Sequence, residues 1–171
     1  MIRAIVYTTN TGTTKEYAKI LADKTGLPYL SLEEAKKRLT KGAEIIYLGW
    51  IMASDIKGYK NAKSHYKICA VGAVDMGQTG TQIVEVRNKT KIPEQIPVFT
   101  LQGGFDIRKL SGMYKIMMRV MVKTAGKALA KKADRTPDED VMLEMMQHDG
   151  NHVCLENLSD MINWYENKVT A

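Results

Sequence analysis

Short apolar runs alternate with amphipathic segments along the chain, and this alternation predicts its architecture. Apolar runs rich in β-branched residues are typical of buried strands, whereas apolar residues spaced three or four apart are typical of helices. Five runs are strand-like: Ile2 to Tyr7, Tyr29 to Leu32, Glu44 to Gly49, Ile68 to Val74 and Pro97 to Leu101. Because helical segments separate them, we predict an α/β fold whose parallel sheet is covered by helices on both faces.

The helices are predicted in the intervals between the strands and after the last one. They are Thr14 to Thr25, Leu32 to Thr40, a segment in the sixties, about Thr79 to Lys89, and Leu155 to Lys168. The last segment has an apolar face that would pack back on the sheet. The chain of 171 residues shows no linker, repeat or low-complexity tract, so we interpret residues 1–171 as one domain.

Composition places the chain among ordinary globular proteins, with 44% hydrophobic and 26% charged residues. It has no apolar run of the roughly 18 residues expected of a membrane span. The first segment is a core strand that contains Arg3, which does not fit a secretory signal, so we expect a cytoplasmic location.

Cysteine and histidine spacing gives no sign of a metal site. Cys69 and Cys154 lie far apart, and we expect both to be core thiols. His148 and His152 stand four residues apart, but Gly150 between them disfavours the helix that a shared metal would need. We also find no nucleophile with a matched base, so any catalysis would come from a bound cofactor and no residue is assigned a catalytic role.

The segment between the first strand and the first helix is rich in hydroxyl groups. It consists of Thr9, Asn10, Thr11, Gly12, Thr13 and Thr14. Backbone N–H groups and hydroxyls in such a turn can surround one anion, and the N-terminal end of the following helix adds partial positive charge. Gly12 would let the backbone approach closely. The alternative is an ordinary turn in which Thr13 or Thr14 caps the helix.

The kind of anion follows from what the turn lacks. It has neither the Gly-Lys-Ser/Thr of a triphosphate loop nor the G-x-G-x-x-G of a dinucleotide loop. It also has no Lys or Arg. A phosphate monoester held by neutral donors is therefore the expected ligand group.

The pattern T-x-T-G-x-T from Thr9 to Thr14 resembles the FMN phosphate loop of flavodoxins, and it lies at the end of the first strand, as in that family. The resemblance implies a flavodoxin-like, doubly wound sheet of five parallel strands in the order 2-1-3-4-5. In such a sheet the ligand lies beyond the carboxyl ends of the strands, at the switch between strands one and three.

Two further loops would then contact the flavin ring. After the third strand, Trp50 would either stack on the ring or be the last core residue of the strand, and Ile51, Met52, Ala53 and Ser54 would offer backbone groups. After the fourth strand, Asp75, Met76, Gly77 and Gly80 would meet the pyrimidine end of the ring, unless this stretch is a plain turn. The fifth strand ends at Gln102 to Phe105, where two glycines would permit close approach.

Two departures from the family weaken a role in one-electron shuttling. Flavodoxins with that role place a glycine shortly after the aromatic residue of the first flavin loop, whereas this chain has no glycine between Trp50 and Gly58. Shuttle flavodoxins are also usually acidic, whereas this chain has a net charge of +6 and a pI near 9.2.

Roughly fifty residues, about 106–153, separate the fifth strand from the last helix, far more than a short connection needs. A helix is predicted from Leu110 to Lys123. The cationic residues recur every four positions at Lys115, Arg119, Lys123, Lys127 and Lys131. The apolar arc beside them is wider than one core-facing side requires.

Three interpretations of this insertion remain open. The helix could pack on its own domain, lie on an anionic membrane surface through Lys115, Arg119 and Lys123, or form a dimer or partner surface. Nucleic acid is not expected, because no aromatic residues interleave the cationic stripe and no reader motif accompanies it.

The Gly-Gly-Phe after the fifth strand and the basic, Met-rich segment Met113 to Met121 resemble the quinone-dependent protoporphyrinogen dehydrogenase group of flavodoxin-domain proteins. This implies an FMN enzyme at the inner membrane face that passes electrons from an organic substrate to a quinone. The first flavin loop of that group contains aromatic and basic residues, which Ile51 to Ser54 do not match. The identity of the substrate therefore stays open. We therefore expect an FMN-binding oxidoreductase with a quinone-like acceptor or a redox partner. The alternative is a non-enzymatic electron carrier that docks by surface charge.

Overall fold

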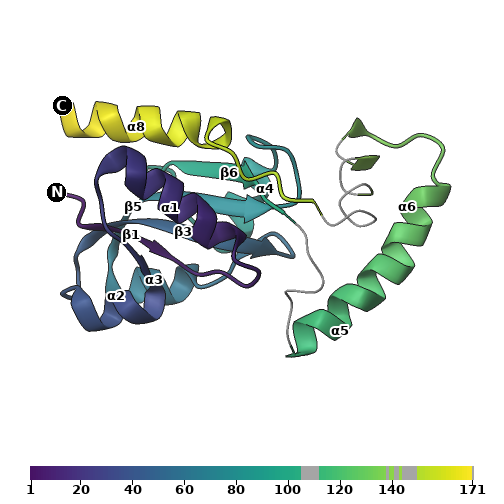
Figure 1. Ribbon diagram of the computed structural model, residues 1–171, viewed down its shortest axis with the longest axis horizontal. Helices are drawn as coiled ribbons and strands as arrows, with labels where there is room; N and C mark the ends of the chain where they lie inside the picture. Colours follow the sequence, from purple (N-terminus) through teal and green to yellow (C-terminus); the bar gives the residue numbers. More distant parts are fainter. Residues whose placement is uncertain (105–111, 138, 141–142, 144–149, 171) are drawn as a thin grey trace.

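The computed structural model describes residues 1–104, 112–137, 139–140, 143 and 150–170 (Figure 1). Its parallel strands have the order β2-β1-β3-β5-β6. They are β1 (Ala4–Tyr7), β2 (Tyr29–Ser31), β3 (Glu44–Met52), β5 (Lys67–Asp75) and β6 (Val98–Gln102). This order confirms the predicted doubly wound sheet, in which all five strands are parallel and β2 lies on one side of β1 while β3, β5 and β6 follow on the other.

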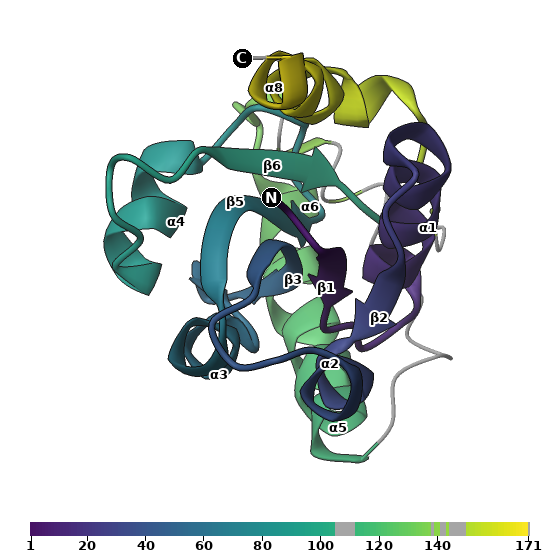
Figure 2. The ribbon, with the colours of Figure 1, turned by 90° about the vertical axis from the view of Figure 1, so that its left-hand side faces the viewer.

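Helices cover both faces of this sheet (Figure 2). One face carries α1 (Thr13–Thr25) and α8 (Ser159–Thr170), with the short 3-10 turn η3 (Glu156–Leu158) before α8. The other face carries α2 (Leu32–Arg38), α3 (Tyr59–His65) and α4 (Ile83–Thr90). The predicted helices are thus present, although α4 begins about four residues later than expected and α8 begins only after η3.

Alternate residues of each central strand enter two separate cores. In β1, Val6 packs under α2 and α3, whereas Ile5 packs under α1 and α8. In β3, Tyr47 and Leu48 divide between the same two cores. This division follows from the two-residue period of a strand, and it explains why β1 reads as a continuous apolar run.

The stretch after the third predicted strand is a β-hairpin, so the prediction of a loop that begins at Trp50 is wrong. Strand β3 continues to Met52, and β4 (Asp55–Ile56) returns antiparallel to it. The two turn residues, Ala53 and Ser54, both have positive φ, at 50° and 61°. This is the backbone of a type I′ turn, whose twist matches that of the paired strands.

Residues 112–131 of the insertion form a helical run that we call the arm. It comprises α5 (Gly112–Met121), the π-helical turn η2 (Val122–Gly126) and α6 (Lys127–Lys131). Leu110, where the predicted helix was to begin, lies outside the described residues. Figure 1 shows the arm beyond the carboxyl ends of the strands, apart from the helices that cover the sheet.

The chain leaves and re-enters the domain at a single point. Gly104 and Asn151 form an antiparallel bridge, and the His152 N–H donates to the Gly103 carbonyl at 3.3 Å. A side chain on Gly104 would meet the Gly150 carbonyl oxygen at 2.7 Å. The close approach that the sequence predicts at these glycines is thus made, at Gly104, by the returning chain.

Buried polar groups fix this point to α1. The Tyr17 hydroxyl donates to the Gln102 carbonyl, and Asn157 Nδ2 donates to Tyr17 Oη at 2.7 Å and to the His152 carbonyl at 3.0 Å. Asn151 Nδ2 donates to Glu16 Oε2 at 3.0 Å. Burial raises the pKa of Tyr17 to about 12, so the phenol stays a neutral donor at physiological pH.

Replacing Tyr17 with Phe tests this polar cluster. We expect Tyr17→Phe to lower the free energy of unfolding by about 1–2 kcal/mol near neutral pH, because Asn157 loses an acceptor and the Gln102 carbonyl loses a donor. The raised pKa stabilises the fold below pH 10, and that contribution is lost as the pH rises from 10 towards 12. The difference between the two proteins should therefore narrow above pH 10.

Urea denaturation at a series of pH values measures this difference. Tyr29→Phe is the control, because Tyr29 is 36% exposed in β2. A stability difference for Tyr17→Phe that stays constant from pH 8 to pH 11.5 would contradict the assignment.

Candidate functional site

The loops that follow β1, β5 and β6 meet at the carboxyl edge of the sheet. The Gly103 N–H donates to the Asp75 carbonyl at 2.6 Å, which joins the ends of β5 and β6. A Cβ on Gly103 would lie 2.7 Å from Val74 Cγ1 and 3.1 Å from Thr13 Cγ2. The start of α1 therefore packs directly against the end of β6, and glycine is required at this contact.

The turn between β1 and α1 is organised by its own hydroxyl groups. Gly12 has φ of 99° and is the N-cap residue of α1. The Gly12 N–H donates to Thr9 Oγ1 at 3.0 Å, and the hydroxyls of Thr11 and Thr13 lie 3.2 Å apart. The threonines thus hold a tight turn in which several polar groups lie close together.

The N-cap residue of α1 is Gly12, and no described side chain caps the helix, so the alternative in which Thr13 or Thr14 caps it is wrong. The Glu16 N–H donates to the Gly12 carbonyl at 3.0 Å, as in a regular first turn. Among the described residues, no acceptor is present for the N–H groups of Thr13, Thr14 and Lys15. Such free donors, together with the positive end of the helix dipole, favour an anion at this position.

A buried tyrosine links this turn to the hairpin. The Tyr47 hydroxyl donates to the Lys57 carbonyl at 2.6 Å and lies 2.9 Å from Thr8 Oγ1. Burial holds the pKa of Tyr47 well above its usual value, so the hydroxyl remains neutral. Sequence reasoning missed Thr8, Tyr47 and Lys57, because only the strand pairing brings them together.

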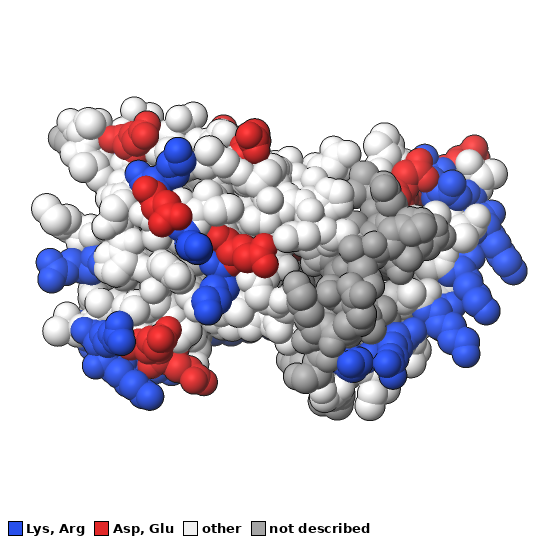
Figure 3. Space-filling view, in the orientation of Figure 1, with Lys and Arg blue, Asp and Glu red and all other residues white. Residues whose placement is uncertain are grey.

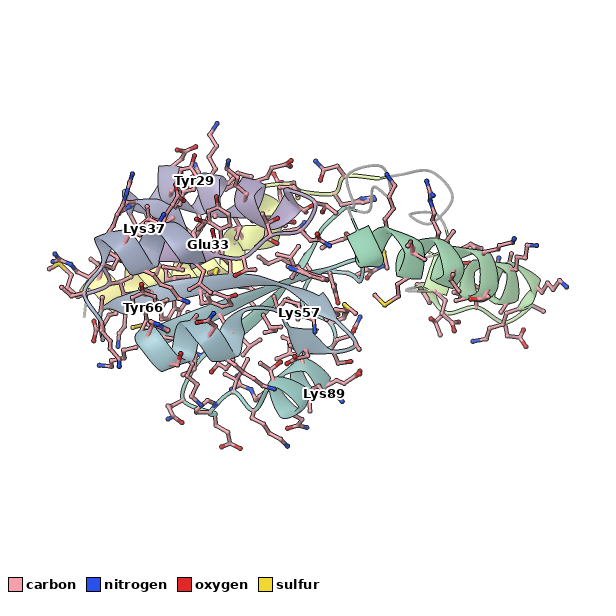
Figure 4. The ribbon with its side chains drawn as sticks, turned by 90° about the horizontal axis from the view of Figure 1, so that it is seen from below. Tyr29, Glu33, Lys37, Lys57, Tyr66 and Lys89 are labelled. Carbon is pink, nitrogen blue, oxygen red and sulfur yellow. The ribbon has the colours of Figure 1, made fainter. Side chains whose placement is uncertain are left out.

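Figure 4 shows Lys57 beside the hairpin, whereas Lys89 lies on α4.

The hairpin carries the residues predicted for one side of a flavin ring. Trp50 pairs with Val74 of β5 and is half-buried, and its strand continues for two further residues. Trp50 is therefore not the last residue of its strand. Ile51 and Met52 pair with Ile56 and Asp55.

The tip of the hairpin is fastened to α4. The Ser54 hydroxyl donates to the Glu85 carboxylate, and the Ile56 N–H donates to Thr90 Oγ1 at 3.1 Å. A pocket lined by Ala53, Ser54, Glu85, Asn88 and Lys89 lies between the tip and α4. Ala53, which was predicted to contact a flavin, borders this pocket.

The stretch from Asp75 to Gly80 is anchored on β6. The Gly77 N–H donates to Asp75 Oδ1 at 2.9 Å, and the Gly80 N–H donates to the Thr100 carbonyl at 3.1 Å. Thr79 Oγ1 accepts from the Gln102 N–H at 2.9 Å. Met76 is half-buried in this stretch. The loop is therefore held at the carboxyl edge, where the sequence places it, and several of its polar groups serve that anchoring.

In the part of the chain that the structure describes, no cysteine or histidine side chain takes part in this arrangement. Cys69 packs against the core under α1, and burial raises the pKa of its thiol. His152 is exposed, and His148 lies outside the described residues. Within the ranges that the structure describes, no group of three or more His, Cys, Asp or Glu side chains could hold a metal ion.

Comparison with known proteins agrees with this geometry. A family model described as a flavodoxin domain matches residues 4–131. The chain belongs to the flavodoxin family. The searches of curated proteins and of solved structures found no match. Flavodoxin domains typically bind FMN and take part in electron transfer, and the quinone-dependent group within the family stays a prediction.

The two glycines that flank α1 provide a matched test of the turn between β1 and α1. Gly12 and Gly26 flank the helix with φ of 99° and 71°, and neither has an atom within 4 Å of an added Cβ. We expect Gly12→Ala and Gly26→Ala each to lower the free energy of unfolding by about 1–2 kcal/mol, because an L-residue is strained in this region.

Urea denaturation checks both variants. The corresponding Asn variants should recover part of the loss, because Asn tolerates positive φ better than Ala. If Gly12→Ala leaves stability unchanged while Gly26→Ala lowers it, the turn does not need the conformation described here.

Proposed function

We propose that this flavodoxin-family protein binds FMN noncovalently and acts as an oxidoreductase between an organic substrate and a quinone-like acceptor. The observation that supports this most strongly is the uncapped start of α1 behind the turn from Thr9 to Thr14. It joins free backbone donors, converging hydroxyls and a positive helix end at the edge of the sheet where ligands of doubly wound folds bind.

The residues present fit the phosphate group of FMN. A phosphate monoester has several acceptor oxygens, and the turn presents several donors without a cation of its own. Thr9 holds the turn by accepting the Gly12 N–H, which leaves Thr11 and Thr13 to face the anion with their hydroxyls. The half-buried position of the turn would strengthen these hydrogen bonds, because less water competes for them.

Two segments at the same edge would hold the ring. The hairpin would place Trp50, Ile51 and Met52 on one side, and the anchored stretch would place Asp75, Met76 and Gly77 on the other. When bound, FMN supplies hydride and single-electron transfer. The chain would bind and orient the ring and exclude water from one of its faces.

Replacing the threonines tests the phosphate assignment. We expect Thr11→Val and Thr13→Val each to weaken FMN binding by roughly 10-fold to 100-fold, because each removes a hydrogen bond to a charged group. Thr9→Val should weaken binding and also destabilise the turn. Quenching of flavin fluorescence on titration with the apoprotein measures the affinity.

Thr25→Val is the matched control, because its hydroxyl donates to the Leu21 carbonyl at the opposite end of α1. Its FMN affinity should equal that of the parent protein. If all four variants bind FMN equally well, the turn is not the phosphate site.

A second candidate is a non-enzymatic electron carrier, which the family favours because flavodoxin domains typically transfer electrons. The enzyme is preferred here because the hairpin turn carries Ala53 and Ser54 in place of glycine, and Ser54 is fastened to Glu85. A turn held in this way resists the peptide flip that accompanies one-electron shuttling in this family.

Spectroelectrochemical titration separates the two candidates. We expect the FMN-loaded protein to take up both electrons at one potential, and Ala53→Gly/Ser54→Gly to split the titration towards two steps because the turn is released. Ser64→Gly on α3 is the control for a serine replaced far from the hairpin. Two well-separated one-electron steps in the parent protein would favour the carrier.

A further inference from the structure

The arm presents apolar and cationic side chains together on one exposed surface. Ile116 is 66% exposed and Val120 is 57% exposed, one helical turn apart on α5. Arg119, Lys123 and Lys127 follow the same spacing and are also exposed. Arg119 lies three residues after Ile116, and Lys123 lies three residues after Val120, so each cation neighbours an apolar side chain on the helix surface.

The charge of this surface is not balanced within the described residues. Arg119, Lys123, Lys127 and Lys131 have no carboxylate within ion-pair distance there. Further along the chain the cations are paired, Lys132 with Glu139 and Arg135 with Asp140. Figure 3 shows Lys and Arg side chains gathered along the outer side of the arm, with acidic side chains only near the end that follows α6.

The position of the arm leaves this surface open to a partner. The arm lies to one side of the sheet and its covering helices in Figures 1 and 4. Ile116 and Val120 remain exposed, so they do not pack the arm against those helices. Within the described ranges, every helix is too short or too polar to span a bilayer. A surface contact is therefore the arrangement that these side chains allow.

We propose that the arm binds the surface of an anionic lipid membrane and lies in its interface. A lipid surface satisfies both features of the arm, since acidic headgroups attract the cations and the acyl boundary accepts Ile116 and Val120. An acidic protein or a nucleic acid would match the charges but would give the branched apolar side chains no particular advantage.

The arm joins the domain next to the proposed FMN site. Its base is the bridge between Gly104 and Asn151, which immediately follows the Gly103 contact with Thr13. Membrane binding would thus bring the carboxyl edge of the sheet near the lipid surface. This consequence rests on the proposed function, whereas the membrane contact itself does not.

Vesicle sedimentation tests the contact with the full-length protein. Vesicles of phosphatidylcholine with phosphatidylglycerol should bind the protein at least roughly 10-fold more tightly than phosphatidylcholine alone, and added salt should weaken the binding. Arg119→Gln/Lys123→Gln should weaken it by roughly 25-fold, because each cation near an anionic surface contributes about fivefold. Ile116→Ser/Val120→Ser should weaken it by roughly 10-fold or more.

Matched variants on other helices control for general effects. Lys60→Gln/Lys63→Gln removes two charges from α3, and Val84→Ser removes a side chain on α4 that is 72% exposed. Both should bind vesicles like the parent protein. FMN affinity is measured in parallel for every variant, so that failure of the membrane contact is distinguished from failure of the flavin site.

Val120→Trp reports insertion directly. Its tryptophan emission, taken as the difference from the parent protein, should shift to shorter wavelength when anionic vesicles are added. Absence of vesicle binding would overturn the proposal. Binding that is insensitive to Ile116→Ser/Val120→Ser would also overturn it, because charge alone would then suffice. Self-association lost in that variant, without vesicle binding, would assign the surface to a second copy of the chain.

Discussion

The candidate site depends on one constraint: α1 begins without a side-chain cap. Its first N–H groups face the carboxyl edge of the sheet, and the conformation of Gly12 turns the chain so that Thr11 and Thr13 lie beside them. Gly103 then packs on Thr13, which fixes the helix start against β6. We call the turn from Thr9 to Thr14 and these N–H groups the cradle. It carries no charged side chain, and water or an anion must accept its hydrogen bonds.

The same helix also anchors the insertion. Glu16 and Tyr17, one turn beyond the cradle, hold the returning chain at Asn151 and Asn157. Because the insertion begins and ends at the bridge between Gly104 and Asn151, the sheet and α8 can pack as they would in a domain without it. The arm can therefore carry a distinct surface, cationic and apolar, without changing the core that positions the cradle.

Much of this architecture could be predicted from the sequence, because the strands have a two-residue period and the turn has a distinctive hydroxyl pattern. The hairpin could not, since Ala53 and Ser54 carry none of the glycine or asparagine signals of a type I′ turn. The sequence indicates close approach at Gly103 but not its contact, because only the fold brings Thr13 against it. Long-range polar contacts such as that of Tyr47 with Thr8 leave no local pattern.

The central claim is that this cradle recognises a phosphate monoester. Comparing the affinities of the apoprotein for FMN and for riboflavin tests it most directly, because the two ligands share the ring and differ by the phosphate. The account predicts that FMN binds at least roughly 100-fold more tightly, since several charge-assisted hydrogen bonds are lost with riboflavin. Equal affinities for the two ligands would contradict it.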